Sequence, residues 1–352
     1  MFNNFIILKS KKVLIFCLAF FYSIAVLTNG LFLASKAYTP EISPKMVQAA
    51  NMISGLFDFI KQTNKATYSS DIVSDTVSEK IIKVYFHKEG YVKEMSLEEY
   101  ITGVLYGEVP SYYCEEALKA QAVAARSYTL YKINNGITHE NGADICTDYS
   151  HCQAWTPNEK ESLYPDSIVQ AVEATQNIIC TYEGACINAL YFSNSAGATE
   201  SIENVWGGNP VPYLKSVYSP GEAEFYDYCQ VKVYSQYEFA ALINAYNSSI
   251  FADFESGIEN IQNIQRSPSG RILSAEIGGI TFTGLQIRAM FGLRSANVHF
   301  CKTGESISVV ALGYGHGVGM SQCGAQAMAQ SGATYDEILK HYYTGIELSS
   351  IA

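Results

Sequence analysis

A single glutamate, Glu108, ends a predicted helix, and Pro110 follows two residues later. The segment around it, Tyr100–Pro110, is otherwise rich in apolar residues. A carboxyl group in such a setting keeps its proton to higher pH, because burial disfavours the charged form. A protonated carboxyl group can give its proton to the leaving oxygen of a glycosidic bond. Glu108 is therefore the candidate general acid, although a glutamate at a helix end is usually a solvated side chain.

A second predicted helix, Glu115–Ile133, carries the polar side chains Lys119, Gln121 and Arg126. Lys119 and Arg126 are seven residues apart, so they share one face of the helix. We expect these side chains to bind polar groups of a substrate or to hold Glu108 in place; the alternative is a solvated basic face. An ion pair between Arg126 and Glu108 would lower the pKa of the carboxyl group and oppose acid catalysis. Arg126 is therefore expected to serve substrate or scaffold.

Four candidate metal ligands fall within 14 residues of one another, namely His139, Cys146, His151 and Cys152. Two thiolates and two imidazoles suit tetrahedral zinc. The spacing is not that of a standard zinc finger, and a Cys146–Cys152 disulfide or free thiols are the alternatives. Because protein would fill all four positions, we expect a structural zinc that fixes the loop beside Glu108.

The segment Tyr191–Glu200 combines small residues with polar side chains. Ser193 and Ser195 could approach a polar ligand closely, and Tyr191 could stack on a sugar ring or donate a hydrogen bond to it. The alternative is an ordinary strand that ends in a turn.

The segment Gly313–Gln322 contains four glycines that alternate with other residues. Such a backbone can approach a ligand or another segment closely, and His316 and Gln322 are its candidate binding side chains. No Gly-Lys-Ser/Thr follows, so the segment is not a P-loop. A tight packing loop is the alternative.

In combination these segments, including EALKAQAVAARSY and GYGHGVGMSQ, resemble the stage II sporulation protein D family of exported lytic transglycosylases. The resemblance spans roughly residues 81–345 and is weakest over 218–300. Glu108 stands at the family's glutamate-X-proline position. The resemblance implies that Glu108 is catalytic, and some members of the family carry zinc at such a His/Cys cluster while others lack the cysteines. The resemblance also implies that eight further residues bind substrate: Lys119, Gln121, Arg126, Tyr191, Ser193, Ser195, His316 and Gln322.

A lytic transglycosylase of this kind is a lyase that leaves a 1,6-anhydro ring on MurNAc-GlcNAc strands of peptidoglycan. The resemblance also implies strands already stripped of stem peptides. It implies a partner, the stage II sporulation protein P amidase, during engulfment of the forespore. The alternatives are a non-catalytic glycan-binding activator of a cell-wall amidase, a zinc hydrolase at the His/Cys cluster, and a serine hydrolase. The last would use Ser193 or Ser195, but the segment lacks a G-x-S-x-G elbow.

The N-terminal residues predict the compartment. Lys9, Lys11 and Lys12 precede the uncharged apolar run Val13–Ala34, which is long enough to span a bilayer. The lysines predict a cytoplasmic N-terminus with the rest outside; a cleaved signal peptide is the alternative. The family resemblance places the anchor in the mother-cell membrane, with the domain facing the intermembrane space. A net charge of −11 argues against general nucleic-acid binding.

The elements predict an α+β fold of mixed helices and antiparallel strands. We expect an anchor (1–37), a linker with an amphipathic helix over Pro44–Gln62 (38–80), a catalytic domain (81–217 and 301–352) and an inserted subdomain (218–300). Ser96 should cap a helix that runs to about Tyr106. Further expected elements are a strand at Ile81, helices over 166–175, 238–246, 323–330 and 335–343, a hairpin over 178–193, a hairpin strand over 279–285, and a strand over 306–312.

Eight cysteines lie outside the predicted anchor, and an exported protein can form disulfides. Cys180 and Cys186 flank the turn at Glu183-Gly184. A two-residue loop would pair Thr181 with Cys186 and leave the sulfurs out of register. A three-residue loop would place the two cysteines opposite each other. The sequence leaves this choice open.

Overall fold

The computed structural model describes residues 79–137, 139–157, 164–246 and 257–351. The apolar run Val13–Ala34 and the predicted helix Pro44–Gln62 lie outside these residues. Within the described ranges, no helix is both long enough and apolar enough to cross a membrane. The described residues belong to one unit, Val77–Ala352.

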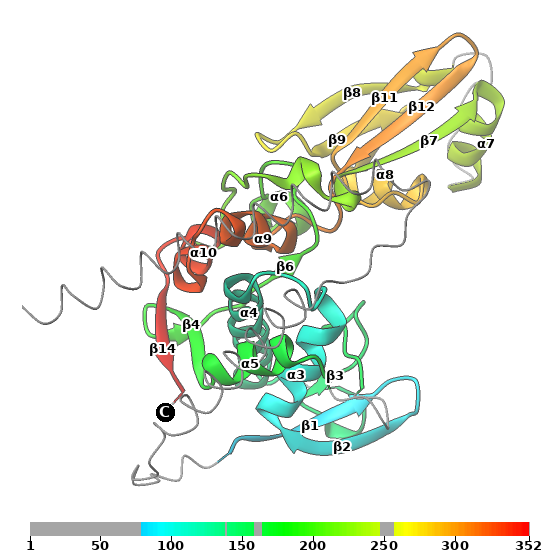
Figure 1. Cartoon of the computed structure of the whole chain (residues 1–352). Coiled ribbons are helices and arrows are strands. Elements are labelled where there is room, and N and C mark those ends of the chain that lie inside the picture. The colour runs from blue at the N-terminus through cyan, green and yellow to red at the C-terminus, as the bar shows by residue number, and fades with distance from the viewer. Residues whose placement is uncertain (1–78, 138, 158–163, 247–256, 352) are drawn as a thin grey trace, which may run out of the picture. The chain divides into compact units, whose positions relative to one another are not determined.

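Helices and mostly antiparallel sheets make up the described chain, as the sequence predicts (Figure 1). The helices are α3 (Leu97–Glu108), α4 (Glu115–Asn134), α5 (Asp166–Ala174), α6 (Ile202–Trp206), α7 (Gln236–Tyr246), α8 (Gly284–Met290), α9 (Gln322–Gln330) and α10 (Tyr335–Tyr342). The strands are β1 (Ile81–Phe86), β2 (Tyr91–Ser96), β3 (Ile145–Cys146), β4 (Ile178–Tyr182), β5 (Ala185–Cys186), β6 (Tyr191–Phe192), β7 (Cys229–Ser235), β8 (Ile261–Arg266), β9 (Ile272–Ile277), β10 (Ile280–Thr283), β11 (Val298–Thr303), β12 (Ser306–Leu312), β13 (Met320–Ser321) and β14 (Glu347–Ser350).

The strands form small sheets with the orders β2-β1-β3, β14-β4-β5, β13-β6, β11-β12-β7 and β10-β9-β8. Most neighbouring strands are antiparallel, but β1 with β3 and β13 with β6 are parallel pairs, which differs from the predicted antiparallel strands. Both parallel pairs are two residues long. Such short pairings carry too little periodicity to be read from sequence.

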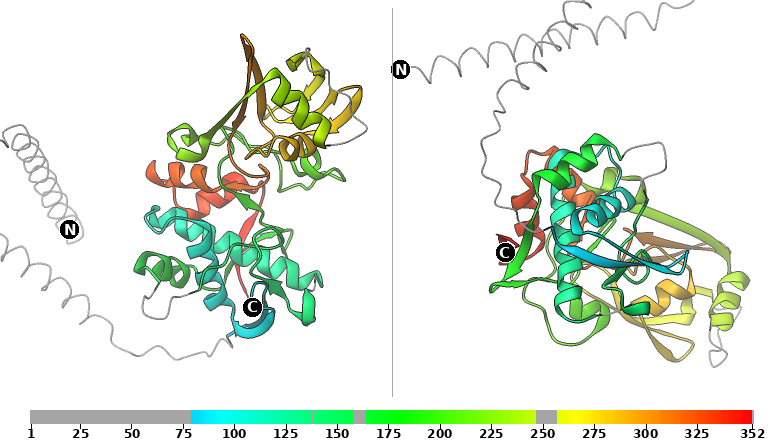
Figure 2. Two further views of the ribbon diagram at one scale, coloured as in Figure 1. Left: turned by 90° about the vertical axis from the view of Figure 1, so that its right-hand side faces the viewer. Right: turned by 90° about the horizontal axis from the view of Figure 1, so that it is seen from below.

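The helix that ends in Glu108 begins where its sequence predicts. The Ser96 hydroxyl accepts a hydrogen bond from the Glu99 backbone N–H at 3.1 Å, which satisfies one of the free donors at the start of α3. The next helix, α4, is buried along most of its length and contacts α3, α5, α9 and α10 (Figures 1 and 2). It is the central support of the domain that carries Glu108.

The buried apolar residues of the described chain form three clusters. The first joins β1, α3, α4 and α5, and another joins α4, α9, α10 and β4. The remaining cluster joins α7, α8 and the sheets of β7 to β12. It includes Ile307, Val309 and Ala311 of β12, because β12 pairs with β7 and β11. The sequence predicts β12 as part of the catalytic domain (301–352), because a strand's own sequence does not reveal its partner.

The hairpin at Glu183-Gly184 takes the two-residue form. Thr181 lies opposite Cys186, and both turn residues have positive φ, 50° and 79°. This is the turn type that fits the twist of paired strands. Cys180 and Cys186 therefore lie out of register, and both are free thiols.

Candidate active site

Glu108 lies at the C-terminal end of α3, on the wall of a cavity of about 660 Å³. Four other predicted binding residues line the same cavity, namely Tyr191, Ser193, His316 and Gln322. Gln322 and Glu108 are 214 residues apart in sequence, so the fold brings distant predicted segments together.

The Glu108 carboxylate has a defined set of hydrogen-bond donors. Oε1 accepts from the Ala154 backbone N–H at 2.6 Å, and Oε2 accepts from Gln322 Nε2 at 3.3 Å. Burial raises the pKa of Glu108, and the hydrogen bonds from Ala154 and Gln322, with a smaller contribution from the nearby Tyr191 hydroxyl, oppose this rise. The net effect is a carboxyl group that is easier to protonate than a solvated glutamate.

Two glycines of α3 allow residues 154–156, whose backbone donates a hydrogen bond to Glu108, to pack closely against the helix. A Cβ at Gly103 would lie 2.2 Å from Trp155 Nε1, and one at Gly107 would lie 3.1 Å from the Ala154 backbone. The Thr156 N–H also donates to the Gly103 carbonyl at 3.0 Å. The glycines therefore make the groove in which the Ala154 N–H meets Glu108. Their four-residue spacing was visible in the sequence, but its purpose was not.

The four candidate metal ligands converge just before this segment. The ligand atoms of His139, Cys146, His151 and Cys152 all lie within 4.8 Å of one another. Cys152 Sγ lies 3.4 Å from His139 Nε2, and Cys146 Sγ lies 3.5 Å from His151 Nδ1. Zinc bond lengths of about 2.0–2.3 Å in a tetrahedron place ligand atoms roughly 3.3–3.8 Å apart. The donor set is one that zinc takes, and these two pairs already have that separation, while the widest separation within the set is up to 4.8 Å.

Gln153 connects the His/Cys cluster to the cavity and was not foreseen from sequence. Its side chain is 2% exposed, donates to Thr129 Oγ1 at 2.9 Å and accepts from the Tyr191 hydroxyl at 2.8 Å. Gln153 stands between the ligand Cys152 and Ala154. Its hydrogen bonds therefore fix both Tyr191 and the backbone donor to Glu108.

Comparison with known proteins identifies the family of this chain. The family model described as stage II sporulation protein matches residues 85–182, which include Glu108 and the whole His/Cys cluster. Stage II sporulation protein D of Bacillus subtilis (strain 168) is 35% identical over 279 residues, which cover 76% of this chain and 78% of that protein. The chain belongs to the stage II sporulation protein D family. The resemblance inferred from the sequence is thereby confirmed.

Two further relatives extend the comparison. Stage II sporulation protein D of Bacillus amyloliquefaciens is 34% identical over 280 residues, covering 76% of this chain and 78% of that protein. The amidase enhancer of Bacillus subtilis (strain 168) is 27% identical over 298 residues, covering 71% of this chain and 40% of the enhancer. The chain is therefore similar both to sporulation proteins and to a protein named for its effect on an amidase.

In this member of the stage II sporulation protein D family, Arg126 belongs to the scaffold. Its guanidinium is fully buried, donates to both carboxylate oxygens of Glu98 at 2.8 and 2.6 Å, and also donates to the Ile178 carbonyl at 3.0 Å. Arg126 is not among the residues that line the cavity. The predicted substrate role is therefore corrected: the side chain joins α3, α4 and β4.

Three more predicted binding residues also lie away from the cavity. Lys119 forms ion pairs with Glu115 at 2.6 Å and Glu116 at 2.9 Å. Gln121 is 1% exposed, with no hydrogen-bond partner among the described residues. Ser195 is fully buried and donates to Glu222 Oε2 at 2.5 Å. Helical spacing placed Lys119 and Gln121 on the helix correctly, but it could not show that protein covers every face of the middle of α4.

His316 lines the cavity between two aromatic rings. Its ring lies 5.4 Å from that of Phe192 and 5.1 Å from that of Trp206, between centroids. Nδ1 accepts from the Val318 N–H at 3.1 Å. Burial, with smaller contributions from Arg288 and Arg271, lowers the pKa of His316 to about 4. His316 is therefore neutral at pH 7 and forms part of an aromatic wall.

Residues from the poorly matched region also reach the cavity. Asp227 and Arg288, both within residues 218–300, line it. Asp227 accepts from Arg294 Nη1 at 3.0 Å and from the Ser193 hydroxyl at 3.5 Å. No motif marks these residues, and only the fold shows that they face Glu108's cavity.

Proposed function

We propose that this protein is a lytic transglycosylase that cleaves peptidoglycan glycan strands, with Glu108 as both acid and base. The observation that carries the proposal is a buried glutamate of raised pKa on the wall of a cavity of about 660 Å³. Aromatic side chains of Tyr191, Trp206 and Tyr314 line this cavity and suit the faces of sugar rings. Family membership supports a role at the cell wall in sporulation, because the relatives are named for sporulation and amidase enhancement.

The reaction follows from the position of one carboxyl group. Protonated Glu108 gives its proton to the glycosidic oxygen, the C1–O bond of the muramic acid residue breaks, and positive charge develops on its ring. The Ala154 N–H and Gln322 stabilise the resulting carboxylate. Glu108 then takes the proton of the same sugar's 6-hydroxyl, whose oxygen bonds to C1. The products are a 1,6-anhydro end and a free hydroxyl, and no water is consumed.

A hydrolase would use a second carboxylate as nucleophile or to activate water. Asp227 is the acidic side chain that shares the cavity, and Arg294 and Ser193 occupy its two oxygens. Its charge suits electrostatic support of a cationic sugar better than attack on one. This favours transglycosylation over hydrolysis.

We also propose that His139, Cys146, His151 and Cys152 hold zinc. The metal would supply no chemistry, since the protein fills four positions. Its role is to fix the loop that continues through Gln153 to the Ala154 N–H. This proposal rests on the convergence of the four ligand atoms.

The setting of the enzyme is proposed from the sequence and the family. Residues 13–34 would anchor the chain in the mother-cell membrane, with the described domain facing the intermembrane space. The substrate would be strands stripped of stem peptides, supplied by the stage II sporulation protein P amidase. The second candidate function is a glycan-binding amidase activator, favoured by similarity to the Bacillus subtilis amidase enhancer.

The test is the full-length Glu108→Gln variant on purified peptide-free strands. We expect cleavage to fall by about 10²–10⁴, the usual contribution of a general acid–base, with glycan binding retained. Glu115→Gln is the control, because Glu115 has a side-chain exposure of 69% and does not line the cavity. Wild-type cleavage by Glu108→Gln would refute the proposal. Binding without cleavage by the wild type, with faster amidase action, would favour the activator.

A further inference from the structure

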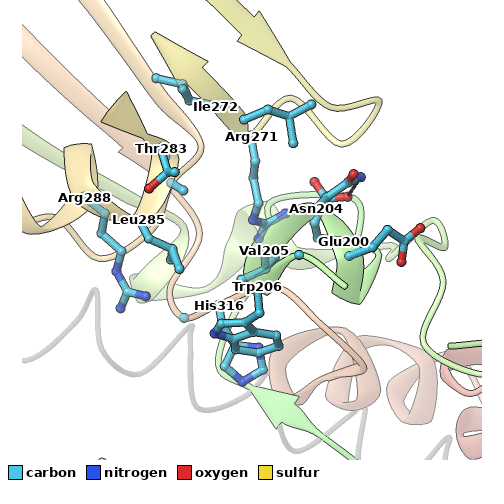
Figure 3. Close-up of a pocket in the computed structure, with 16 residues that line it drawn as sticks. Glu200, Asn204, Val205, Trp206, Arg271, Ile272, Thr283, Leu285, Arg288 and His316 are labelled. Carbon is cyan, nitrogen blue, oxygen red and sulfur yellow. Dashed lines mark hydrogen bonds between the residues drawn. The ribbon is translucent and has the colours of Figure 1, made fainter. Parts of the chain in front are cut away.

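A second cavity of about 360 Å³ adjoins the one that contains Glu108. The two cavities share four lining residues, Trp206, Arg288, Gly315 and His316. Figure 3 shows the side chains around this side cavity, with Arg288 and Leu285 on one side and Glu200 on the other. A group attached to a bound strand could therefore enter the side cavity past Trp206 and Arg288.

Arg288 is a positive charge at this junction without a carboxylate partner in the described part of the chain. It lies on α8, and its Nε donates to the Leu293 carbonyl at 3.2 Å, which leaves both Nη groups for a ligand. Partial burial lowers the pKa of Arg288, because the charge is partly removed from water. An anion in the cavity would relieve this cost.

The two neighbouring arginines are already engaged. Arg271, 2% exposed, donates to the Ala198 and Ser195 carbonyls, and the negative charges of Glu200 and Glu222 act on it. Arg294 pairs with Asp227 at 3.0 Å. Arg271 keeps one unpartnered donor, its buried Nε, so Arg288 is the arginine of this group that has both Nη groups left for a ligand.

The surroundings limit which anion can bind. The chain has a net charge of −11, and Glu200 and Glu203 line the side cavity. A polyanion would be repelled, whereas one carboxylate held at Arg288 would not. Leu285 and Ile272 add apolar wall that suits a small alkyl group beside that carboxylate. The geometry therefore fits a small carboxylate with an alkyl substituent.

We propose that Arg288 binds the free lactyl carboxylate of an N-acetylmuramic acid residue and so selects strands without stem peptides. This inference rests on the proposed function, because it takes peptidoglycan as the substrate. In a peptide-bearing strand the lactyl carboxyl group is an uncharged amide, which cannot form a charge-assisted bond with a guanidinium. Removal of the peptide creates the anion that Arg288 recognises. The C-terminal carboxylate of a stem peptide is the other carboxylate that a strand can offer.

The experiment compares three strand preparations with full-length protein. They are peptide-free strands, the same strands with lactyl groups converted to methylamides, and strands with intact peptides. We expect the wild type to prefer free acid over methylamide by roughly 10- to 100-fold in kcat/KM, the range of a hydrogen bond to a charged group. The difference should lie in KM. A preference for peptide-bearing strands would instead assign Arg288 to the peptide terminus and overturn the proposal.

The variants isolate the charge of Arg288. Arg288→Gln should reduce the free-acid to methylamide ratio to about 1, and Arg288→Lys should keep part of the preference. Lys302→Gln is the matched control, a cation on β11 that lines neither cavity, and its ratio should equal that of the wild type. An unchanged ratio in Arg288→Gln, with wild-type thermal unfolding, would overturn the proposal.

Binding measurements separate this claim from the catalytic one. In the Glu108→Gln background, calorimetric affinity for free-acid over methylamide strands should still depend on Arg288. If no preparation is cleaved but this dependence holds, the proposed reaction fails and the recognition of a carboxylate stands. If strands are cleaved but the affinity does not depend on Arg288, the proposed reaction stands and the recognition of a carboxylate fails.

Discussion

The hydrogen bond from Gln322 to Glu108 allows a quantitative test of how the site sets the acidity of its carboxyl group. Gln322 Nε2 donates to Glu108 Oε2 at 3.3 Å, and its side chain lies in the cavity wall. This bond stabilises the carboxylate and so lowers the pKa of Glu108 against the rise caused by burial. Gln322→Leu removes the donor and keeps a similar volume, so it should raise the pKa further.

The size of the effect follows from the bond length. Hydrogen bonds to charged groups contribute about 1.5–3 kcal/mol, and this long one should contribute about 1 kcal/mol. Since about 1.4 kcal/mol corresponds to a tenfold change in acid dissociation, the effect is a shift of roughly 0.7 pH units. The general acid acts when protonated, and activity is lost as pH rises through its pKa. The basic limb of the pH profile should therefore move upward.

The assay is the pH dependence of kcat/KM for strand cleavage by the wild type, Gln322→Leu and Gln326→Leu. Gln326 lies one turn further along α9 and accepts from the Cys114 N–H at 2.7 Å, away from Glu108. Gln326→Leu should therefore keep the basic limb of the pH profile at its wild-type position. A basic limb in Gln322→Leu that stays in place or moves to lower pH would refute the account of Glu108, whatever happens to the absolute rate.

Three further predictions concern the support of the site. Arg126→Met leaves Glu98 with a largely buried, unpaired charge, so it should lower the free energy of unfolding measured in urea titrations by about 3–5 kcal/mol. Adding Glu98→Gln to Arg126→Met removes that charge and should restore part of the lost stability. Gly103→Ala forces a Cβ against Trp155 and should cost about 1–3 kcal/mol and reduce cleavage; wild-type melting and activity would contradict the packing argument. Metal analysis of chelator-free protein should find one zinc per chain, and Cys146→Ser should lose it and melt at lower temperature; metal-free wild type would refute the zinc proposal.

Local features of this chain were predictable because short-range physics sets them. The Ser96 cap and Pro110 mark the ends of α3, and the predicted strand over 306–312 is observed as β12. The two thiols and two imidazoles were identified by residue type, and the fold brings them within 4.8 Å. In these cases each signal lies within a few residues of the feature that it predicts.

Features that depend on tertiary contacts were not predictable. Lys119 and Arg126 do share α4, but only the packing of α3 and β4 shows that Arg126 pairs with Glu98. Likewise, Arg288 comes from a segment with no motif, and it meets His316 only through the fold. Sequence spacing defines a face of a helix but not what covers that face.

The most direct test of the central claim is the mass of the products that the full-length wild type releases from peptide-free strands. Direct attack by the sugar's own 6-hydroxyl predicts fragments with 1,6-anhydro ends, lighter by one water than hydrolysed fragments. Fragments with hydrated reducing ends would contradict the account. Asp227, the other carboxylate in the cavity, would then be the first residue to substitute.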